Sequence, residues 1–154
     1  MAKIIQLACE VADVHRRYAE IHSALFGVSS FRLAVSALAG RGRWRYSEYR
    51  STLSGLLQRL ADLGTQIAAC GASERTSRGA EELQRVMLQY VEALERVMRG
   101  LLNINDRLAD NDRNYRYADD SGVSPLIRDK AEYARTVSEM EYLGNRLNRL
   151  FSTY

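Results

Sequence analysis

The stretch AEELQRVMLQYVEALERVMRGLLNINDRL, residues 80–108, decides the fold class of this chain. Its apolar residues recur at spacings of three and four, and the seam that they form is Ala80, Leu83, Met87, Tyr90, Leu94, Val97, Leu101, Ile104 and Leu108. Apolar side chains at this spacing lie along one stripe of an α-helix, and only a partner helix can cover such a stripe. The stretch therefore predicts a long helix that packs against other helices.

Three further seams supply the expected partner helices. They are Ile4, Leu7, Val11, Val14, Tyr18, Ile21 and Leu25; then Tyr46, Tyr49, Leu53, Leu56, Leu60, Leu63, Ile67 and Cys70; and last Tyr133, Val137, Met140, Leu143, Leu147, Leu150 and Tyr154. With glycines and polar turns as boundaries, the expected long helices cover residues 3–26, 44–70, 78–110 and 125–151, and a short helix covers 30–39. Ser124 is the expected N-cap of the last helix and Pro125 its first residue.

These elements predict an all-α fold in a single domain, residues 1–154. The expected arrangement is an up-down-up-down four-helix bundle with one short helix between the first two long ones, because short connections favour antiparallel neighbours. The alternative is that the hairpin of helices 44–70 and 78–110 stays partly open and uses its seam in another subunit.

The composition is that of an ordinary globular chain, with 46% hydrophobic and 27% charged residues. It contains no run of about 18 apolar residues, so no membrane span is expected. The first residues lack the continuous apolar segment and the cleavage site of a signal peptide. We expect a cytoplasmic protein, or one that is exported without a cleaved signal peptide.

Motifs for catalysis, cofactors and metals do not stand out. The Glu-x-x-His motif of a di-iron bundle is absent, since alanines stand three residues before His15 and His22. Both histidines lie beside the first seam, which is typical of residues at the boundary of a core. Cys9 and Cys70 form no Cys-x-x-Cys motif. We expect no catalytic residue, no cofactor and no metal site, and we identify no small-molecule substrate.

A basic turn precedes the second long helix, where Arg41, Arg43, Trp44 and Arg45 surround Gly42. Guanidinium groups and an indole at a helix start suit phosphate binding and base stacking, so nucleic-acid binding is the alternative function. The competing interpretation is that the acidic segment after the third long helix neutralises this turn. That segment contains Asp106, Asp110, Asp112, Asp119 and Asp120. The net charge of only +3 favours neutralisation.

The residues Tyr115-Arg116-Tyr117-Ala118-Asp119 follow directly on the expected helical hairpin. Here the chain resembles the helical-hairpin substrates of type VII secretion, which carry a Tyr-x-x-x-Asp/Glu export signal just beyond the second helix. The resemblance covers residues 45–120 and implies that Tyr115 and Asp119 form such a signal, although the family's Trp-x-Gly is absent from the hairpin turn. The alternative is that Tyr115 and Tyr117 anchor this loop against the end of the bundle.

A second apolar edge widens the stripe of the third long helix, and its residues are Val86, Val91, Met98 and Leu102. A stripe of this width suits a bundle core or a groove that accepts another helix. Together with the absence of catalytic motifs, it favours a non-enzymatic protein–protein interaction module. Such a module would be an adaptor, a chaperone, an assembly subunit or a secreted substrate, and its partner would be a helical protein or a second copy of the chain.

Overall fold

The computed structural model describes residues 2–26, 42–70, 78–110, 113–118 and 120–153, and for residues 42–44 and 113 it describes the backbone alone. All regular structure within them is helical: α1 (Ala2–Phe26), α3 (Gly42–Cys70), α4 (Arg78–Ala109), α5 (Arg113–Arg116) and α6 (Pro125–Phe151). The all-α class is therefore confirmed, and the four long helices begin and end within two residues of the expected positions. The short helix expected at residues 30–39 lies outside the described residues.

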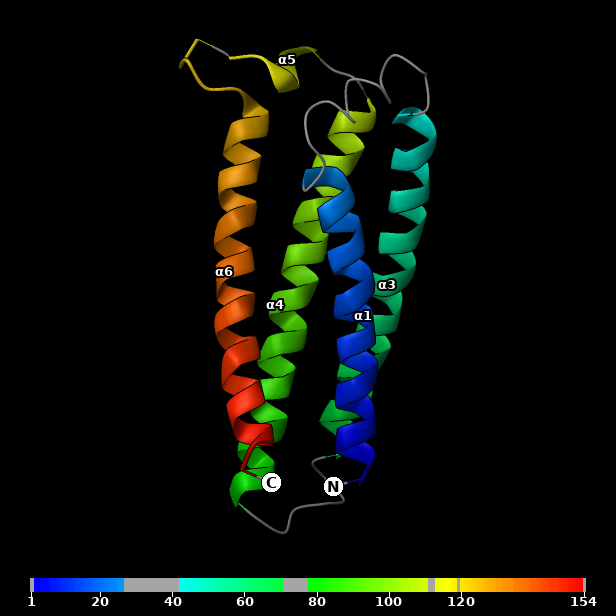
Figure 1. The fold of residues 1–154 in the computed structure, drawn as a ribbon, viewed down its shortest axis with the longest axis vertical. Helices are drawn as coiled ribbons and strands as arrows, with labels where there is room; N and C mark the ends of the chain where they lie inside the picture. The colour runs from blue at the N-terminus through cyan, green and yellow to red at the C-terminus, as the bar shows by residue number, and fades with distance from the viewer. Residues whose placement is uncertain (1, 27–41, 71–77, 111–112, 119, 154) are drawn as a thin grey trace.

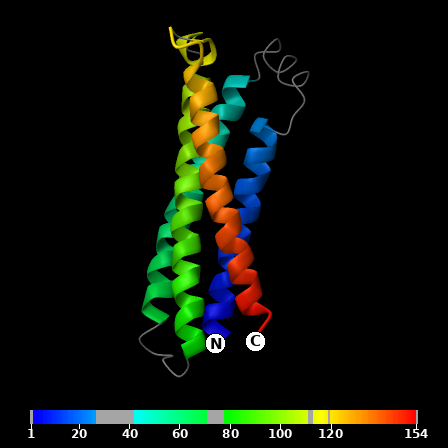
Figure 2. The same ribbon diagram turned by 90° about the vertical axis from the view of Figure 1, so that its left-hand side faces the viewer.

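The four long helices lie side by side along a common axis, which makes the molecule elongated (Figures 1 and 2). α4 is the central helix, because it packs against both α3 and α6 along their length. α1 packs against α3 and makes a shorter contact with α4. The two chain ends lie at the same end of the molecule, and α5 lies at the opposite end (Figure 1).

The heptad seams of the first three long helices fill the core. Every seam residue of α1 is buried, and so is every seam residue of α3 from Leu53 to Cys70. α4 buries its seam from Leu83 to Ile104 and most of its second edge, as a central helix with neighbours on several sides must. Burial of this kind is the main source of stability for helices of amphipathic sequence.

α6 differs from the other long helices because its apolar stripe is incompletely covered. Only Tyr133 and Met140 of its seam are buried. The remaining described positions of the seam are half-buried, namely Val137, Leu143, Leu147 and Leu150. The backbones of α6 and α1 make little direct contact, so the side of α6 toward α1 keeps part of its apolar surface accessible.

The start of α6 is as expected from the sequence. Ser124 is in an extended conformation, with φ −72° and ψ 148°, and its hydroxyl accepts a hydrogen bond from the backbone N–H of Ile127 at 3.2 Å. Pro125 is the first helical residue, where its missing N–H has no helical partner to lose.

Candidate functional site

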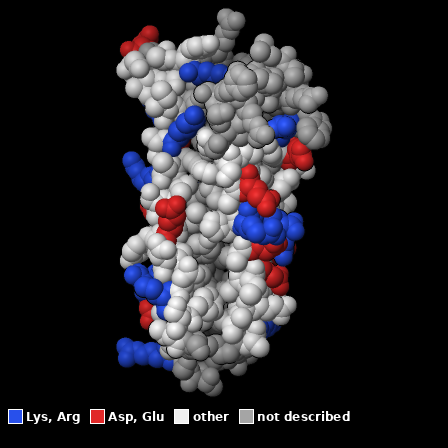
Figure 3. All heavy atoms as spheres, viewed as in Figure 1, with Lys and Arg blue, Asp and Glu red and all other residues white. Residues whose placement is uncertain are grey.

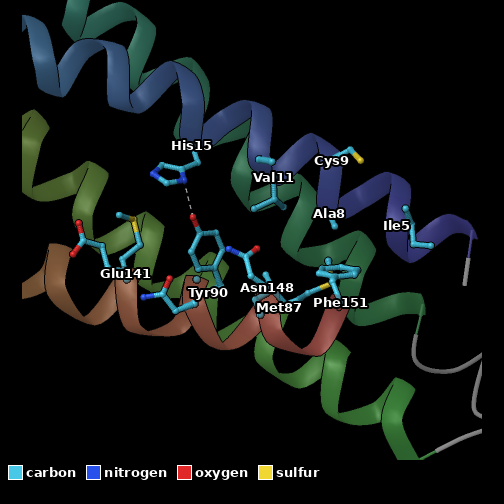
Figure 4. Close-up of a pocket in the computed structure, with 15 residues that line it drawn as sticks. Ile5, Ala8, Cys9, Val11, His15, Met87, Tyr90, Glu141, Asn148 and Phe151 are labelled. Atoms are coloured by element: carbon cyan, nitrogen blue, oxygen red, sulfur yellow. Dashed lines mark hydrogen bonds between the residues drawn. The ribbon is translucent and has the colours of Figure 1, made fainter. Parts of the chain in front are cut away.

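A groove with a volume of about 720 Å³ lies between α1 and α6, and α4 forms its floor (Figure 4). This volume is within the range of about 300–1,000 Å³ that is usual for binding sites. Its surface is mainly apolar, with side chains that include Ile5, Val11, Met87, Met140, Leu147 and Phe151. The groove therefore offers accessible apolar surface next to the core.

The groove exists because small residues stand on both of its walls. Ala8 and Ala12 line it from α1 and Gly144 lines it from α6. A Cβ atom at Gly144 would lie 3.2 Å from Cε2 of Tyr90, so the glycine lets the Tyr90 ring lie directly against α6. Ile5 stands on the rim and is 48% exposed, which extends the apolar surface beyond the groove itself.

His15 and Tyr90 form a polar pair at the groove, the first from α1 and the second from α4 (Figure 4). The Tyr90 hydroxyl and Nδ1 of His15 lie 2.9 Å apart and share a hydrogen bond. Burial lowers the pKa of His15, and the nearby Glu141 carboxylate acts in the opposite direction. Burial also raises the pKa of Tyr90 to about 12, so both groups are neutral at neutral pH.

A cluster around Tyr133 joins α1 to α6 beyond the groove. The Tyr133 hydroxyl bonds both to the Tyr18 hydroxyl and, at 2.6 Å, to Nδ1 of His22. The His22 and Phe26 rings each lie 5.6 Å from the Tyr133 ring between centroids. Burial lowers the pKa of His22 and holds the pKa of Tyr133 well above its usual range. The expectation of boundary histidines is confirmed, since both are half-buried.

Glu141 is the only residue with a full formal charge at neutral pH among those that line the groove. It is exposed, and within the described part of the chain no ion pair of its carboxylate is found. Other acidic residues of the same region are paired, since Glu139 lies 3.9 Å from Arg96 and Glu82 lies 2.9 Å from Arg146. Uncharged surface extends along this face of the molecule, between charged side chains on either side (Figure 3).

The two cysteines differ in accessibility. Cys9 is exposed and lines the groove, whereas Cys70 is buried at the end of α3. No group of three or more His, Cys, Asp or Glu side chains is placed to hold a metal ion within the ranges that the structure describes. None of the described helices combines the length and the hydropathy that crossing a membrane would require.

Tyr115, the first residue of the expected export motif, is buried with 1% of its surface exposed. Its hydroxyl donates to Oδ2 of Asp129 at 2.8 Å, and the Arg107 guanidinium lies 4.1 Å from the centre of its ring. Asp119, the last residue of the motif, lies outside the described residues. Tyr117 is 67% exposed and is therefore not an anchor. In this conformation Tyr115 acts as the anchor between α4 and α6 and is not accessible to a recognition protein.

The basic turn is described only in part. Arg41 lies outside the described residues, and so do the side chains of Arg43 and Trp44. Arg45 is exposed on the first turns of α3. One contact of the expected kind is present nearby, since Nε of Arg50 lies 3.7 Å from Oδ1 of Asp106.

The second edge of α4 is covered inside the chain. Val86 and Met98 have no exposed surface, Val91 is 5% exposed, and Leu102 is half-buried against the core. Val86, Val91 and Met98 are therefore covered within the chain, and Leu102 alone of the four keeps part of its surface accessible. Among the exposed large apolar side chains of the described residues, Ile5 lies on α1, and Ile127 and Tyr142 lie on α6.

Sequence reasoning missed the groove, the two Tyr–His pairs and the isolated position of Glu141. One signal was available for Glu141, because no basic residue stands three or four positions from it, where helical neighbours meet.

Comparison of this chain with protein-family models, with curated proteins and with solved structures finds no match.

Proposed function

We propose that this chain is a non-enzymatic protein–protein interaction module that binds an amphipathic helix of another protein in the groove between α1 and α6. In this proposal the four long helices form an up-down-up-down bundle that is open on one side. The observation that carries the proposal is the accessible apolar groove beside the half-buried stripe of α6.

The dimensions of the groove support a helical occupant. Its walls extend from Ile5 to His15 on α1 and from Met140 to Phe151 on α6. At a rise of 1.5 Å per residue, each wall is about 15 Å long, or about three helical turns. A docked helix presents anchors at positions i, i+3 or i+4, and i+7, which fit this length.

The side chains of the groove support the binding of helices with apolar residues of different shapes. Met87 on the floor and Met140 on the wall are flexible and polarisable, and methionines adapt to side chains of different shape. Ile5 lines the groove and is 48% exposed, and a helix lying along the groove would cover this apolar side chain.

Selection from a displayed library of random peptides about 16 residues long, enough for four helical turns, tests the proposal. We expect selected peptides to share apolar residues at helical spacing and to slow the alkylation of Cys9, which lines the groove and is the accessible one of the two thiols. Ala12→Trp, which fills the groove from an exposed position on α1, should abolish binding.

Ser51→Trp is the matched control, because Ser51 is exposed on α3 and does not line the groove. Peptides without helical periodicity, or peptides that bind the Ala12→Trp variant as well as the original protein, would contradict the proposal.

A further inference from the structure

We infer that the helix bound in this groove carries a lysine or arginine that pairs with Glu141. The inference rests on the proposed function and adds the charge of the partner to it. It starts from a contrast within the groove, where a single carboxylate stands among apolar and uncharged polar side chains.

Glu141 forms no ion pair with a cation of the described residues. The positions three and four residues away on α6 hold Val137, Ser138, Gly144 and Asn145, none of which is basic. The described residues of α1 and α4 that line the groove are all uncharged at neutral pH, and this includes His15, because burial lowers its pKa. A partner's cation would thus meet no competitor within the described part of the groove.

The position of Glu141 also favours pairing on binding. It stands on the wall of the groove, at the same end as His15 and Tyr90 (Figure 4). A helix that covers the apolar floor removes water from this carboxylate, and a carboxylate that loses water without gaining a partner opposes binding. A lysine or arginine has the additional advantage that its methylene groups extend along apolar surface while its charge reaches the rim.

Repeating the peptide selection on three forms of the protein tests the inference. Against the original chain we expect lysine and arginine to be enriched over aspartate and glutamate at one position of the helical pattern. Against Glu141→Gln the enrichment should vanish, and against Glu141→Lys it should reverse in favour of acidic residues. Replacing the enriched lysine of a selected peptide by glutamine should weaken binding to the original chain by about two- to fivefold, as is usual for partly exposed ion pairs.

Glu139→Gln is the control, because Glu139 lies on the same helix, pairs with Arg96 and does not line the groove. Helical peptides that protect Cys9 but show no basic preference, or the same preference against Glu141→Gln, would overturn the inference and leave the proposed function in place. A selection that yields no helical peptide would overturn both. Protection of Cys9 that rises with the concentration of the protein alone would mean that a second copy fills the groove, and this also would overturn the inference.

Discussion

Asp129 accepts a hydrogen bond from the Tyr115 hydroxyl at 2.8 Å, and this contact attaches the turn of α5 to the beginning of α6. The same carboxylate oxygen accepts from Arg107 at 3.0 Å, so residues from α4, α5 and α6 meet at one oxygen atom. Burial and the bond to Asp129 together raise the pKa of Tyr115 well above its usual range. The reversal of the chain between α4 and α6 is therefore fixed by side chains.

Tyr115→Phe should lower the free energy of unfolding by about 1–2 kcal/mol, because it removes one hydrogen bond to a charged acceptor and leaves the ring in place. Urea denaturation of the two proteins measures the difference. Tyr117→Phe is the control and should change nothing, since Tyr117 is 67% exposed. An equal effect of the two substitutions would mean that the bond to Asp129 contributes no stability.

Most of the fold could be predicted from the sequence because the spacing of a heptad seam determines which side chains share one face of a helix. All of the α1 seam, for example, is buried as its spacing predicts. Periodicity does not state whether a neighbouring helix covers that face. Leu147 belongs to the seam of α6 as Leu7 belongs to the seam of α1. Leu147 is nevertheless only half-buried, because α6 has α4 on one side and the groove on another.

The candidate site was harder to predict because it depends on distances between helices. The pairing of His15 with Tyr90 joins residues 75 positions apart, and no local pattern carries such information. The burial of Tyr115 likewise depends on Asp129 and Arg107, which belong to different helices. Glu141 could have been noticed from its lack of basic neighbours, but its place in a groove could not.

The pKa values of His15 and His22 are both lowered by burial, and this predicts that acid weakens the fold. A histidine with a lowered pKa binds its proton more readily in the unfolded chain. The stability that these neutral histidines contribute is therefore fully present above the unfolded value of 6.5 and is lost as the pH falls through their folded values. We expect the free energy of unfolding to fall as the pH is lowered below the unfolded value of 6.5.

The double variant His15→Gln with His22→Gln tests this assignment. It should be less stable than the original chain at neutral pH, and its stability should depend less on pH in the same interval. Carboxylates such as Asp13, whose pKa is lowered chiefly by its hydrogen bond to Arg16, titrate in both proteins and cancel in the comparison. Parallel curves of unfolding free energy against pH would show that neither histidine is responsible.

Asn105 is buried in α4 with no exposed surface, and its amide is only half-satisfied. Nδ2 donates to the carbonyl oxygen of Tyr46 at 2.9 Å, whereas Oδ1 has no hydrogen-bond partner among the described residues. Asn105→Leu should raise the free energy of unfolding by about 1 kcal/mol, because it removes a buried acceptor without a partner and adds apolar contact. Asn105→Asp, of nearly the same shape, should lower it, because it buries a charge. Thermal unfolding of both variants measures the two signs, and a loss of stability in both would mean that the amide stabilises the α3–α4 contact.

Gly55 and Gly144 are both helical glycines, and they should respond differently to alanine. A Cβ atom at Gly55 would meet nothing within 4 Å, so Gly55→Ala should raise the free energy of unfolding by about 0.5–1 kcal/mol through helix propensity alone. At Gly144 the same atom would lie 3.2 Å from the Tyr90 ring, so the ring must move and the gain in the free energy of unfolding should shrink or change sign.

Because Tyr90 bonds to His15, the displacement of the Tyr90 ring should also alter the groove. Gly144→Ala should therefore change the alkylation rate of Cys9, while Gly55→Ala leaves it unaltered. Equal stabilisation by the two substitutions, with no change at Cys9, would show that the wall between α6 and Tyr90 is looser than the structure indicates.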